Sequence, residues 1–550
     1  NRERHVDASF MANEIVFPFA FPLPPTISDA GANGIIYGTL IVVLLVTAGF
    51  ALVTREAKGA YNKDQFLAAR NSQGVVSLTL SYFVSGMGAW VIFAVPQAAV
   101  VGGSIALAGY ALSACFPLLI FGKIAPKMRE LLPQGYTLNE YIIGRYGRVN
   151  AAYMGLVSLF YMMLYLTAEL ASAGTLASTL TNIKTQDDTW WKNENTFVAM
   201  PVSPIVGTAF ITLLYTAIGG LPVSILTDRV QGVGIFFLTL IVAFASYAEA
   251  GVGSQEAFDE VTGKGVHPIY VPTNYGNSFA IAISLILGVT CANMVHAGYW
   301  QRIWAAESNV AVTRATQYSS VLTLIVMILV GVTGFIAYSQ FSGLMTPGVP
   351  GGDLSWLSVP WLINQFMGQG WAVVTLIFGI SMIASTCDTL QSGMAALLLP
   401  VASLLPIPER AHIVVVILAM VVLNVPPILL ALSGQSILQL FLLADLLAAG
   451  VVAPIFLGFW KRTHPVGALA GSIGGLVTSI VVYAVGDNYD EGLAARRQPA
   501  PAGRPRAPPL PPPAAALGQP ASLLRSERDC LQRASSRPTE RARPHPPLRR

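Results

Sequence analysis

The chain has 550 residues and a net charge of +4, and 54% of its residues are hydrophobic while only 11% are charged. Ordinary soluble domains carry roughly a quarter charged residues. The composition therefore excludes an ordinary soluble protein and predicts an all-α protein with many membrane spans.

Apolar stretches long enough to cross a bilayer as helices, about twenty residues each, recur twelve times along the sequence. The predicted spans are 34–54, 75–105, 107–126, 150–180, 204–222, 226–248, 276–300, 317–340, 369–400, 411–431, 434–459 and 466–486. Residues 1–33 precede them and are predicted to be an extracellular segment, since their apolar patch is broken by prolines and lacks a small-residue cleavage site.

The distribution of basic residues predicts the orientation of the spans. If the loop after span 34–54 is cytoplasmic, the inside loops hold fifteen Lys and Arg residues, and the outside segments up to residue 495 hold five. Basic residues near span ends favour the cytoplasmic side. We therefore expect the N-terminus to lie outside. We also predict that the protein is located in the plasma membrane.

The end of the chain changes character at about residue 495, where Pro, Ala and Arg come to dominate. Such a composition cannot pack a core, so we predict a disordered tail over 487–550. The abrupt change suggests an out-of-frame tail in place of a thirteenth span. A transcript that reads through to another hydrophobic helix would support this hypothesis, and its absence would count against it.

The spans between the first and the last form two blocks, 75–248 and 276–459, with five spans each. An odd number of spans gives the two blocks opposite orientations, the inverted-repeat plan of many secondary transporters. Span 34–54 then precedes the repeat and span 466–486 follows it. The predicted fold is thus a 5+5 inverted repeat with flanking helices.

The first span of each block is interrupted by helix-weakening residues. Span 75–105 contains Ser85, Gly86, Gly88 and Pro96, and span 276–300 contains "TCANMVHAG". Backbone groups left unpaired in lipid cost several kcal/mol each. Such breaks therefore persist where protein, ion or solute satisfies the backbone, and they indicate candidate binding sites.

The stretch "SMIASTCDTLQS" brings polar side chains into an apolar span. Met382, Ser385, Thr386 and Thr389 share one helical face, and their hydroxyls, with carbonyls from a broken helix, would suit a hard cation such as sodium. The alternative is that the hydroxyls bond their own helix or join two helices. Asp388 favours the first interpretation, because a carboxylate in mid-membrane usually marks an ion or proton path.

Four stretches appear in the order known for one transporter family: "SGMGAWVIFAVP", "YTAIGGLPVSILTDRVQ", "GYWQRIWAA" and "ASTCDTLQS". On these motifs, residues 34–486 resemble the sodium:solute symporter family, which has the leucine-transporter-type inverted repeat. Some of the motifs are similar to those of the proline branch and others to those of the urea branch.

The resemblance implies a sodium site between the first and eighth core helices. Its ligands would be the carbonyls of Val84, Met87 and Met382 and the hydroxyls of Ser385 and Thr386. The proline branch has an aspartate immediately before Met87, whereas this chain has Gly86.

The resemblance also implies a path for the ion towards the cytoplasm. It assigns Asp228 to the ion exit, and the alternative for Asp228 is an ion pair with its neighbour Arg229. Asp388 is expected on an ion path because of its position in mid-membrane, and the alternative for it is a structural role. Sodium would be the coupling ion rather than a tightly held cofactor.

The solute is expected beside the two broken helices, in contact with Trp90, Tyr165, Asn293 and His296. Each of these residues could instead pack or join helices. Glu169 and Asp445 are further carboxylates within spans and could carry protons, bind a second ion or pair within the protein. Because no carboxylate adjoins Met87, we expect a small neutral or zwitterionic solute rather than a cation, with sugars left open.

The predicted function is sodium-coupled symport that imports a small polar solute, such as a proline-like amino acid or urea. The alternatives are proton-coupled symport and a non-transporting solute sensor. We expect no enzyme, because hydrolase motifs are missing, and no nucleotide-driven pump, because no P-loop is present. The expected partners are the solute, sodium and the lipid bilayer, with no nucleic acid, and homo-oligomerisation is left open.

Overall fold

The computed structural model describes residues 27–58, 63–181, 183, 200–249, 275–340, 354–402, 406–435 and 437–497. Over these ranges the chain forms helices and two isolated β-bridges, and no strand. The helices are α1 (Asp29–Lys58), α2 (Lys63–Ala68), α3 (Val75–Val84), α4 (Trp90–Leu131), α5 (Leu138–Tyr146), α6 (Arg148–Leu180), α7 (Val202–Glu249), α9 (Tyr275–Val295), α10 (Ala297–Ala305), α11 (Asn309–Gln340), α12 (Ser358–Leu362), α13 (Gly368–Ala402), α14 (Glu409–Leu432), α15 (Ile437–Leu457) and α16 (Pro465–Arg497), with short helical turns at Ser355–Leu357 and Ile363–Met367.

The prediction of an all-α protein with many membrane spans is confirmed. In the described part of the chain, ten helices are long and apolar enough to cross a membrane. Two of them are kinked at a glycine with positive φ, Gly103 in α4 and Gly220 in α7, a conformation that L side chains rarely adopt. Dividing both helices at these glycines would give twelve segments, but the number of spans stays a prediction.

The helices at the two ends of the chain extend beyond the predicted spans. Where the extracellular segment ends stays a prediction, whereas the start of the disordered tail at residue 487 is wrong. Helix α1 begins at Asp29, so the last residues of the segment 1–33 are helical, while 1–26 lie outside the described residues. Helix α16 runs to Arg497, well past residue 487, where the disordered tail was expected to begin. The polar residues after 486 continue the helix because they include no proline before residue 499. The rest of that tail, 498–550, lies outside the described residues.

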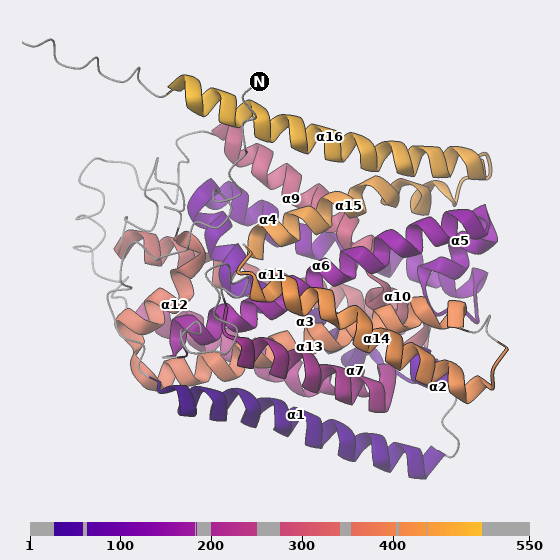
Figure 1. The fold of residues 1–550 in the computed structure, drawn as a ribbon, viewed down its shortest axis with the longest axis horizontal. Coiled ribbons are helices and arrows are strands. Elements are labelled where there is room, and N and C mark those ends of the chain that lie inside the picture. The colour runs from indigo at the N-terminus through magenta and orange to yellow at the C-terminus, as the bar shows by residue number, and fades with distance from the viewer. Residues whose placement is uncertain are drawn as a thin grey trace, which may run out of the picture. The chain divides into compact units, whose positions relative to one another are not determined.

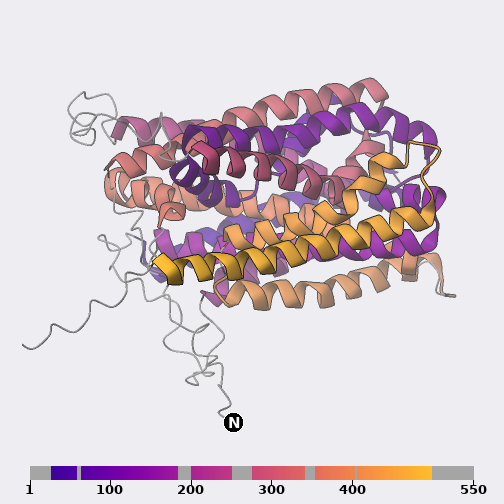
Figure 2. The same ribbon diagram turned by 90° about the horizontal axis from the view of Figure 1, so that it is seen from above.

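The chain divides into two units, Asn1–Ala484 and Val485–Arg550. In the first unit the long helices lie side by side along a common direction (Figures 1 and 2). Helix α13 packs against α6 and α7, α11 packs against α3 and α4, and α15 packs against α6 and α9. All of these contacts except the one between α15 and α9 join helices from the two predicted blocks, 75–248 and 276–459, whose boundaries stay predictions.

Both predicted interruptions coincide with breaks in helices. Helix α3 ends at Val84 and α4 begins at Trp90, so the segment 85–89 is not helical. Helix α9 ends at Val295, and α10 begins after His296, whose φ of −73° and ψ of 102° are not helical. Glycines and the "VHAG" stretch weaken the helices at these points, and the neighbouring protein must satisfy the freed backbone groups.

Candidate functional site

The two broken helices lie next to each other. The ring of Tyr82, near the end of α3, stacks on the ring of Tyr299 in α10 with centroids 5.9 Å apart and planes 14° apart. The Tyr82 hydroxyl also donates a hydrogen bond to the Tyr299 carbonyl oxygen at 3.3 Å. Segments more than 200 residues apart in the sequence therefore meet at the point where both helices are interrupted.

The segment between α3 and α4 is crowded by side chains from other helices. A Cβ on Gly86 would lie 2.0 Å from the hydroxyl oxygen of Tyr299, and a Cβ on Gly88 would lie 1.7 Å from Glu169 Oε1. The other carboxylate oxygen of Glu169 accepts a hydrogen bond from the Ala89 N–H at 3.1 Å, at the start of α4. The aspartate that the proline branch carries at the position of Gly86 would find this space taken by Tyr299.

The predicted sodium ligands are all buried, and their hydrogen bonding differs. The Val84 carbonyl accepts a hydrogen bond from the Met87 N–H at 2.9 Å. The Ser385 hydroxyl donates to Asp228 Oδ1 at 2.7 Å. The Thr386 hydroxyl is fully buried and has no hydrogen-bond partner among the described residues. An unsatisfied buried polar group costs about 1–3 kcal/mol, so Thr386 is a candidate ligand for something that the protein does not itself supply.

Glu169 lies at the level of Thr386 where α6 packs against α13. A Cβ on Gly379 would lie 2.2 Å from Leu176, and one on Gly393 would lie 3.2 Å from Met162. The earlier glycine of α13 meets the later residue of α6, and the later glycine meets the earlier residue, so α6 and α13 are antiparallel. Glu169 and Thr386 are each midway between the two contacts, and Glu169 Oε1 also has no hydrogen-bond partner in the described part of the chain.

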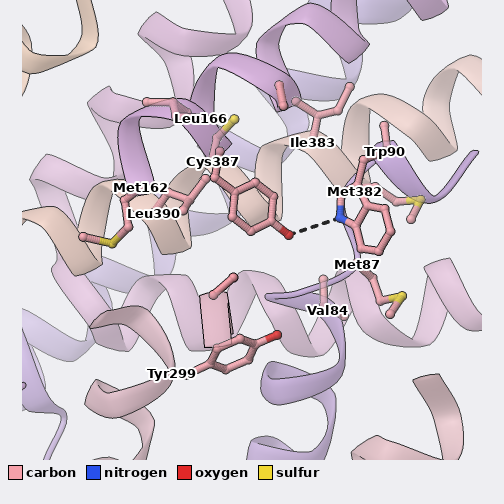
Figure 3. Packing of buried hydrophobic residues seen from close by; sticks show 14 of the residues in the cluster. Val84, Met87, Trp90, Met162, Leu166, Tyr299, Met382, Ile383, Cys387 and Leu390 are labelled. Carbon is pink, nitrogen blue, oxygen red and sulfur yellow. Dashed lines mark hydrogen bonds between the residues drawn. The ribbon is translucent and has the colours of Figure 1, made fainter. Parts of the chain in front are cut away.

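Apolar side chains surround the α3–α4 break. Val84, Met87, Trp90 and Met382 belong to one cluster of buried residues. Figure 3 shows members of this cluster around the hydrogen bond that Trp90 Nε1 donates to the Tyr165 hydroxyl at 3.1 Å. The Met382 side chain is therefore part of an apolar wall, and Met382 could reach an ion only through its backbone carbonyl.

Asp228 forms a buried ion pair, and the partner is not the one considered from the sequence. Arg302 Nη2 donates to Asp228 Oδ2 at 2.8 Å, and both side chains are fully buried. The neighbouring Arg229 instead donates to Ser77 at 2.6 Å and to Gln73. The pairing with Arg229 is thus wrong, and Arg302, which was counted with the cytoplasmic loops, lies in the protein interior.

Asp388 is held by hydroxyl groups of α7. Ser224 donates to its Oδ1 at 2.6 Å, and Thr227 and Tyr215 donate to its Oδ2 at 3.0 and 3.1 Å. Charge-assisted hydrogen bonds of this kind are about twice as strong as neutral ones. Asp388 therefore connects α13 to α7, and its role in an ion path stays a prediction.

A cavity opens beside the α3–α4 break. The space that the centre of a water molecule can reach there is about 40 Å³, while one water needs roughly 10–15 Å³. A few waters fit, and an amino acid or sugar needs the walls to move. Trp90, Tyr165 and Asn293 line this cavity, as do Gly86 and Met87.

His296 is not among the residues that line the cavity. Its Nδ1 accepts a hydrogen bond from the Gly298 N–H at 3.1 Å and so caps the start of α10. Its ring lies against Tyr161, Tyr165 and Tyr299, with centroids 6.0, 5.9 and 5.0 Å away. Its Nε2 has no hydrogen-bond partner among the described residues, so direct contact between His296 and a solute stays a prediction.

Several residues of the cavity were not placed there from the sequence. Asp445 was noted only as a carboxylate within a span, and it lines the cavity. Seven aromatic side chains line it as well: Phe83, Trp90, Tyr110, Tyr161, Tyr165, Tyr299 and Phe441. They come from α3, α4, α6, α10 and α15, and aromatic residues are too common in membrane helices to stand out before the helices are assembled.

The groups at the site are ones that can bind an ion and a small molecule. In the described ranges no group of three or more His, Cys, Asp or Glu side chains could hold a metal ion. Hydroxyls and backbone carbonyls remain as ligands for a hard monovalent cation. The neighbouring cavity supplies rings, an amide and a carboxylate for a small organic molecule.

Comparisons with known proteins give the same picture. The model of the sodium:solute symporter family matches residues 65–475. The spermidine transporter DUR31 of Candida albicans is 26% identical over 82% of this chain and 80% of its own length, and the sodium/glucose cotransporter of Vibrio parahaemolyticus is 24% identical over 74% and 79%. A solved structure described as the substrate-bound outward-open state of a Na+-coupled sialic acid symporter has the same fold, with a TM-score of 0.58 at 15% identity over 82% of this chain and 97% of that one.

Proposed function

Since the chain belongs to the sodium:solute symporter family, we propose that it couples the inward movement of sodium to the import of a small polar solute. The observation that carries the proposal is the buried Thr386 hydroxyl, which has no hydrogen-bond partner among the described residues. It lies beside Ser385, which Asp228 connects to Ser81 near the end of α3. The protein would alternate between outward-open and inward-open forms around this fixed site.

The proposed sodium ligands are the carbonyls of Val84, Met87 and Met382 and the hydroxyls of Ser385 and Thr386. These residues would supply five oxygen ligands. That number is close to the six to eight oxygen ligands of calcium, another hard cation. The bond from Ser385 to Asp228 does not exclude Ser385, because a hydroxyl that donates its proton keeps two lone pairs as acceptors. Asp228 would instead turn these lone pairs towards the ion.

The α3–α4 break explains how ion and solute become coupled. Val84 and Met87 would bind the ion through their carbonyls, while Met87 and Trp90 line the cavity. Ordering this short segment around an ion would therefore also order the cavity wall. Because one segment belongs to both sites, binding of the ion would favour binding of the solute. The coupling free energy between two such sites is commonly about 1–3 kcal/mol.

We also propose the path by which the ion leaves. Asp228 and Asp388 would guide sodium from the Ser385–Thr386 pair towards the cytoplasm, with the N-terminus outside and the plasma membrane as the location. The buried Asp228–Arg302 pair supports a polar passage at this depth, because it keeps a carboxylate next to Ser385.

The experiment that tests the function is uptake into proteoliposomes of labelled solutes with and without an inward sodium gradient. We expect accumulation that requires the gradient and that falls sharply in Ser385→Ala and Thr386→Ala. Uptake that ignores sodium and is unchanged in both variants would refute the proposal.

A second candidate is proton coupling, and Glu169 favours it. One oxygen of this buried carboxylate has no hydrogen-bond partner in the part of the chain that is described, and it lies beside the same break. Uptake that persists without sodium, collapses with the pH gradient and is lost in Glu169→Gln would favour this mechanism over sodium coupling.

The relatives do not agree on the charge of the solute. The names given above refer to spermidine, which is a cation, glucose, which is neutral, and sialic acid, which is an anion. The class of solute for this chain must therefore come from its own cavity.

A further inference from the structure

Asp445 is the charged residue of the cavity. It lies on α15, and no other acidic side chain and no basic side chain lines the cavity. Among the described residues, no hydrogen bond or ion pair to the Asp445 carboxylate is found. A carboxylate within a membrane span costs several kcal/mol unless it is partnered. A positively charged group or a proton donor that entered the cavity would therefore stabilise Asp445.

The other carboxylates in the spans differ from Asp445 in this respect. Asp228 has Arg302 and two serine hydroxyls, Asp388 has the hydroxyls of α7, and Glu169 has the Ala89 N–H. Each of them is satisfied at least in part by the protein itself. Asp445 is the carboxylate that faces the cavity and depends on what enters it.

Aromatic rings surround the same space. Phe441 lies one helical turn before Asp445, so both side chains are on one face of α15. The Phe441 ring is 4.9 Å from the Tyr165 ring and 5.5 Å from the Trp90 ring, and the Trp90 ring is 5.5 Å from the Tyr110 ring, measured between centroids. Ring faces attract cations, most strongly where water is excluded, and aromatic cages are the usual receptors for ammonium groups.

Asn293 adds a hydrogen-bond acceptor to the cavity. Its Nδ2 donates one of its two N–H groups to the Val289 carbonyl oxygen at 2.8 Å within α9, so its Oδ1 and its second N–H are left to meet a ligand. Acceptors of this kind recognise N–H donors. The tyrosine hydroxyls could serve the remaining polar groups of a solute.

We propose that the solute is a protonated organic amine, whose ammonium group pairs with Asp445 inside the cage formed by Trp90, Tyr110, Tyr165 and Phe441. This inference rests on the proposed transport function and names its substrate class. It replaces the expectation of a neutral or zwitterionic solute, which considered only the position beside Met87. A zwitterion fits less well, because no basic side chain of the cavity would meet its carboxylate.

The size of the cavity says which part of the amine is held there. About 40 Å³ accommodates an ammonium head and not a whole solute. The rest of the molecule would require the walls to part, as they do in an open state. The cage is thus a recognition site for the charged end.

The test is equilibrium binding to the purified full-length protein in detergent, at saturating sodium and pH 7. The probes are labelled spermidine and choline as amines, proline as a zwitterion and glucose as a neutral solute. The variants are Asp445→Asn, Asp445→Glu, Phe441→Leu and Phe441→Trp, with Glu130→Gln as the control, since Glu130 is an exposed carboxylate near the end of α4. Sodium affinity is measured on every variant by thermal shift.

At least one amine should bind, and proline and glucose should not. Asp445→Asn should weaken amine binding by ~30-fold or more, as expected for one partner of a buried charge pair, and Asp445→Glu should restore part of it. Phe441→Leu should weaken binding by ~3- to 10-fold while Phe441→Trp retains it. Sodium affinity should be unchanged in the Asp445 variants, and Glu130→Gln should behave as the parent.

Binding of proline or glucose but neither amine, or amine binding that is equal in the parent and in Asp445→Asn, would overturn the inference. A failure of the transport proposal looks different. In that case the amine binds through Asp445, but proteoliposomes show no uptake driven by a sodium or pH gradient.

Discussion

Thr386 is fully buried, and its hydroxyl oxygen has no hydrogen-bond partner among the described residues. Several other buried threonines share this property, but Thr386 is the one that adjoins Ser385 in the proposed sodium site. Its neighbour Ser385 has the same burial but bonds to Asp228. The pair therefore presents one oxygen fixed in direction by the protein and one that is free to respond to a ligand. This difference leads to a different expectation for each residue.

Thr386→Ala should lower sodium affinity and should leave the stability of the sodium-free protein unchanged or slightly raised, because an unsatisfied buried hydroxyl is removed. Ser385→Ala should lower both, because it also removes a donor to Asp228, at a cost of about 1.5–3 kcal/mol for a bond to a charged group. Thermal unfolding at several sodium concentrations measures both quantities. Thr386→Ser serves as the control, and equal destabilisation by the two alanine variants would contradict the assignment.

A methyl group added at Gly88 should disturb the proposed site. In Gly88→Ala the new Cβ would lie 1.7 Å from Glu169 Oε1, so Glu169 must move and give up its bond to the Ala89 N–H. We expect a loss of stability of about 1–3 kcal/mol together with reduced uptake. Gly467→Ala is the matched control, since nothing lies within 4 Å of its Cβ position. Parental behaviour of Gly88→Ala in unfolding and uptake assays would argue against the crowded break.

At the scale of elements, the contact between α7 and α13 depends on Asp388. Its carboxylate accepts from Ser224, Thr227 and Tyr215, all on α7. In Asp388→Ala the Ser224 hydroxyl loses its acceptor, whereas Tyr215 and Thr227 keep carbonyl acceptors at Ala384 and Ser224. We therefore expect a loss of about 1–3 kcal/mol in unfolding free energy, the cost of one unsatisfied buried group.

Asp388→Asn separates a structural role from a role in the ion path. The amide keeps one acceptor oxygen, so much of the stability should return. Stability measured by thermal unfolding and sodium-driven uptake should then recover together. Recovered stability with uptake still absent would show that the charge itself carries the ion.

The kink in α7 depends on Gly220. Its φ of 60° disfavours any L side chain, and a Cβ there would also lie 2.3 Å from the Phe66 carbonyl oxygen. Gly147 has a φ of 88° but nothing within 4 Å of its Cβ position. Gly147→Ala should therefore cost about 1–2 kcal/mol for the backbone alone, and Gly220→Ala should cost clearly more. Equal losses in thermal unfolding would show that the kink tolerates a side chain.

The positions of the two helix interruptions could be predicted from the sequence, but the residues that contact them could not. Glycine, proline and polar residues in the first span of each block indicated that α3–α4 and α9–α10 would be interrupted. The sequence does not encode directly that Tyr299 fills the place next to Gly86, or that Arg302 reaches Asp228 from 74 residues away. Those contacts depend on how the helices pack, and a linear pattern contains only neighbours within one helix.

At the scale of the whole molecule, composition and hydropathy were sufficient for the fold class, and four motifs were sufficient for the family. The position of the cavity was predicted only in part: Trp90, Tyr165 and Asn293 line it, whereas His296 does not. Asp445 could be recognised as a carboxylate within a span, but its place at the cavity depends on how α15 packs against the other helices. A carboxylate of the last core helix can serve the same space when the helices close around it.

The orientation of the molecule in the membrane is open to a direct test. The excess of basic residues on one side predicts that the start of α1 is outside and the end of α4 is inside. In a variant without its native cysteines, Asp29→Cys should react with an impermeant maleimide on intact cells, and Glu130→Cys should react only after permeabilisation. The reverse pattern would invert the topology, and the buried Asp228 would then lie towards the extracellular side of the protein.

The Asp228–Arg302 pair has an electrical consequence. The two charges cancel and lie 2.8 Å apart in the protein interior, so the membrane potential exerts almost no net force on them, although it acts with about 2.3 kcal/mol per 100 mV on a lone charge that crosses the bilayer. Voltage should therefore act on the cargo and on the carboxylates that no cationic side chain pairs with, and the current that accompanies transport should report what is carried.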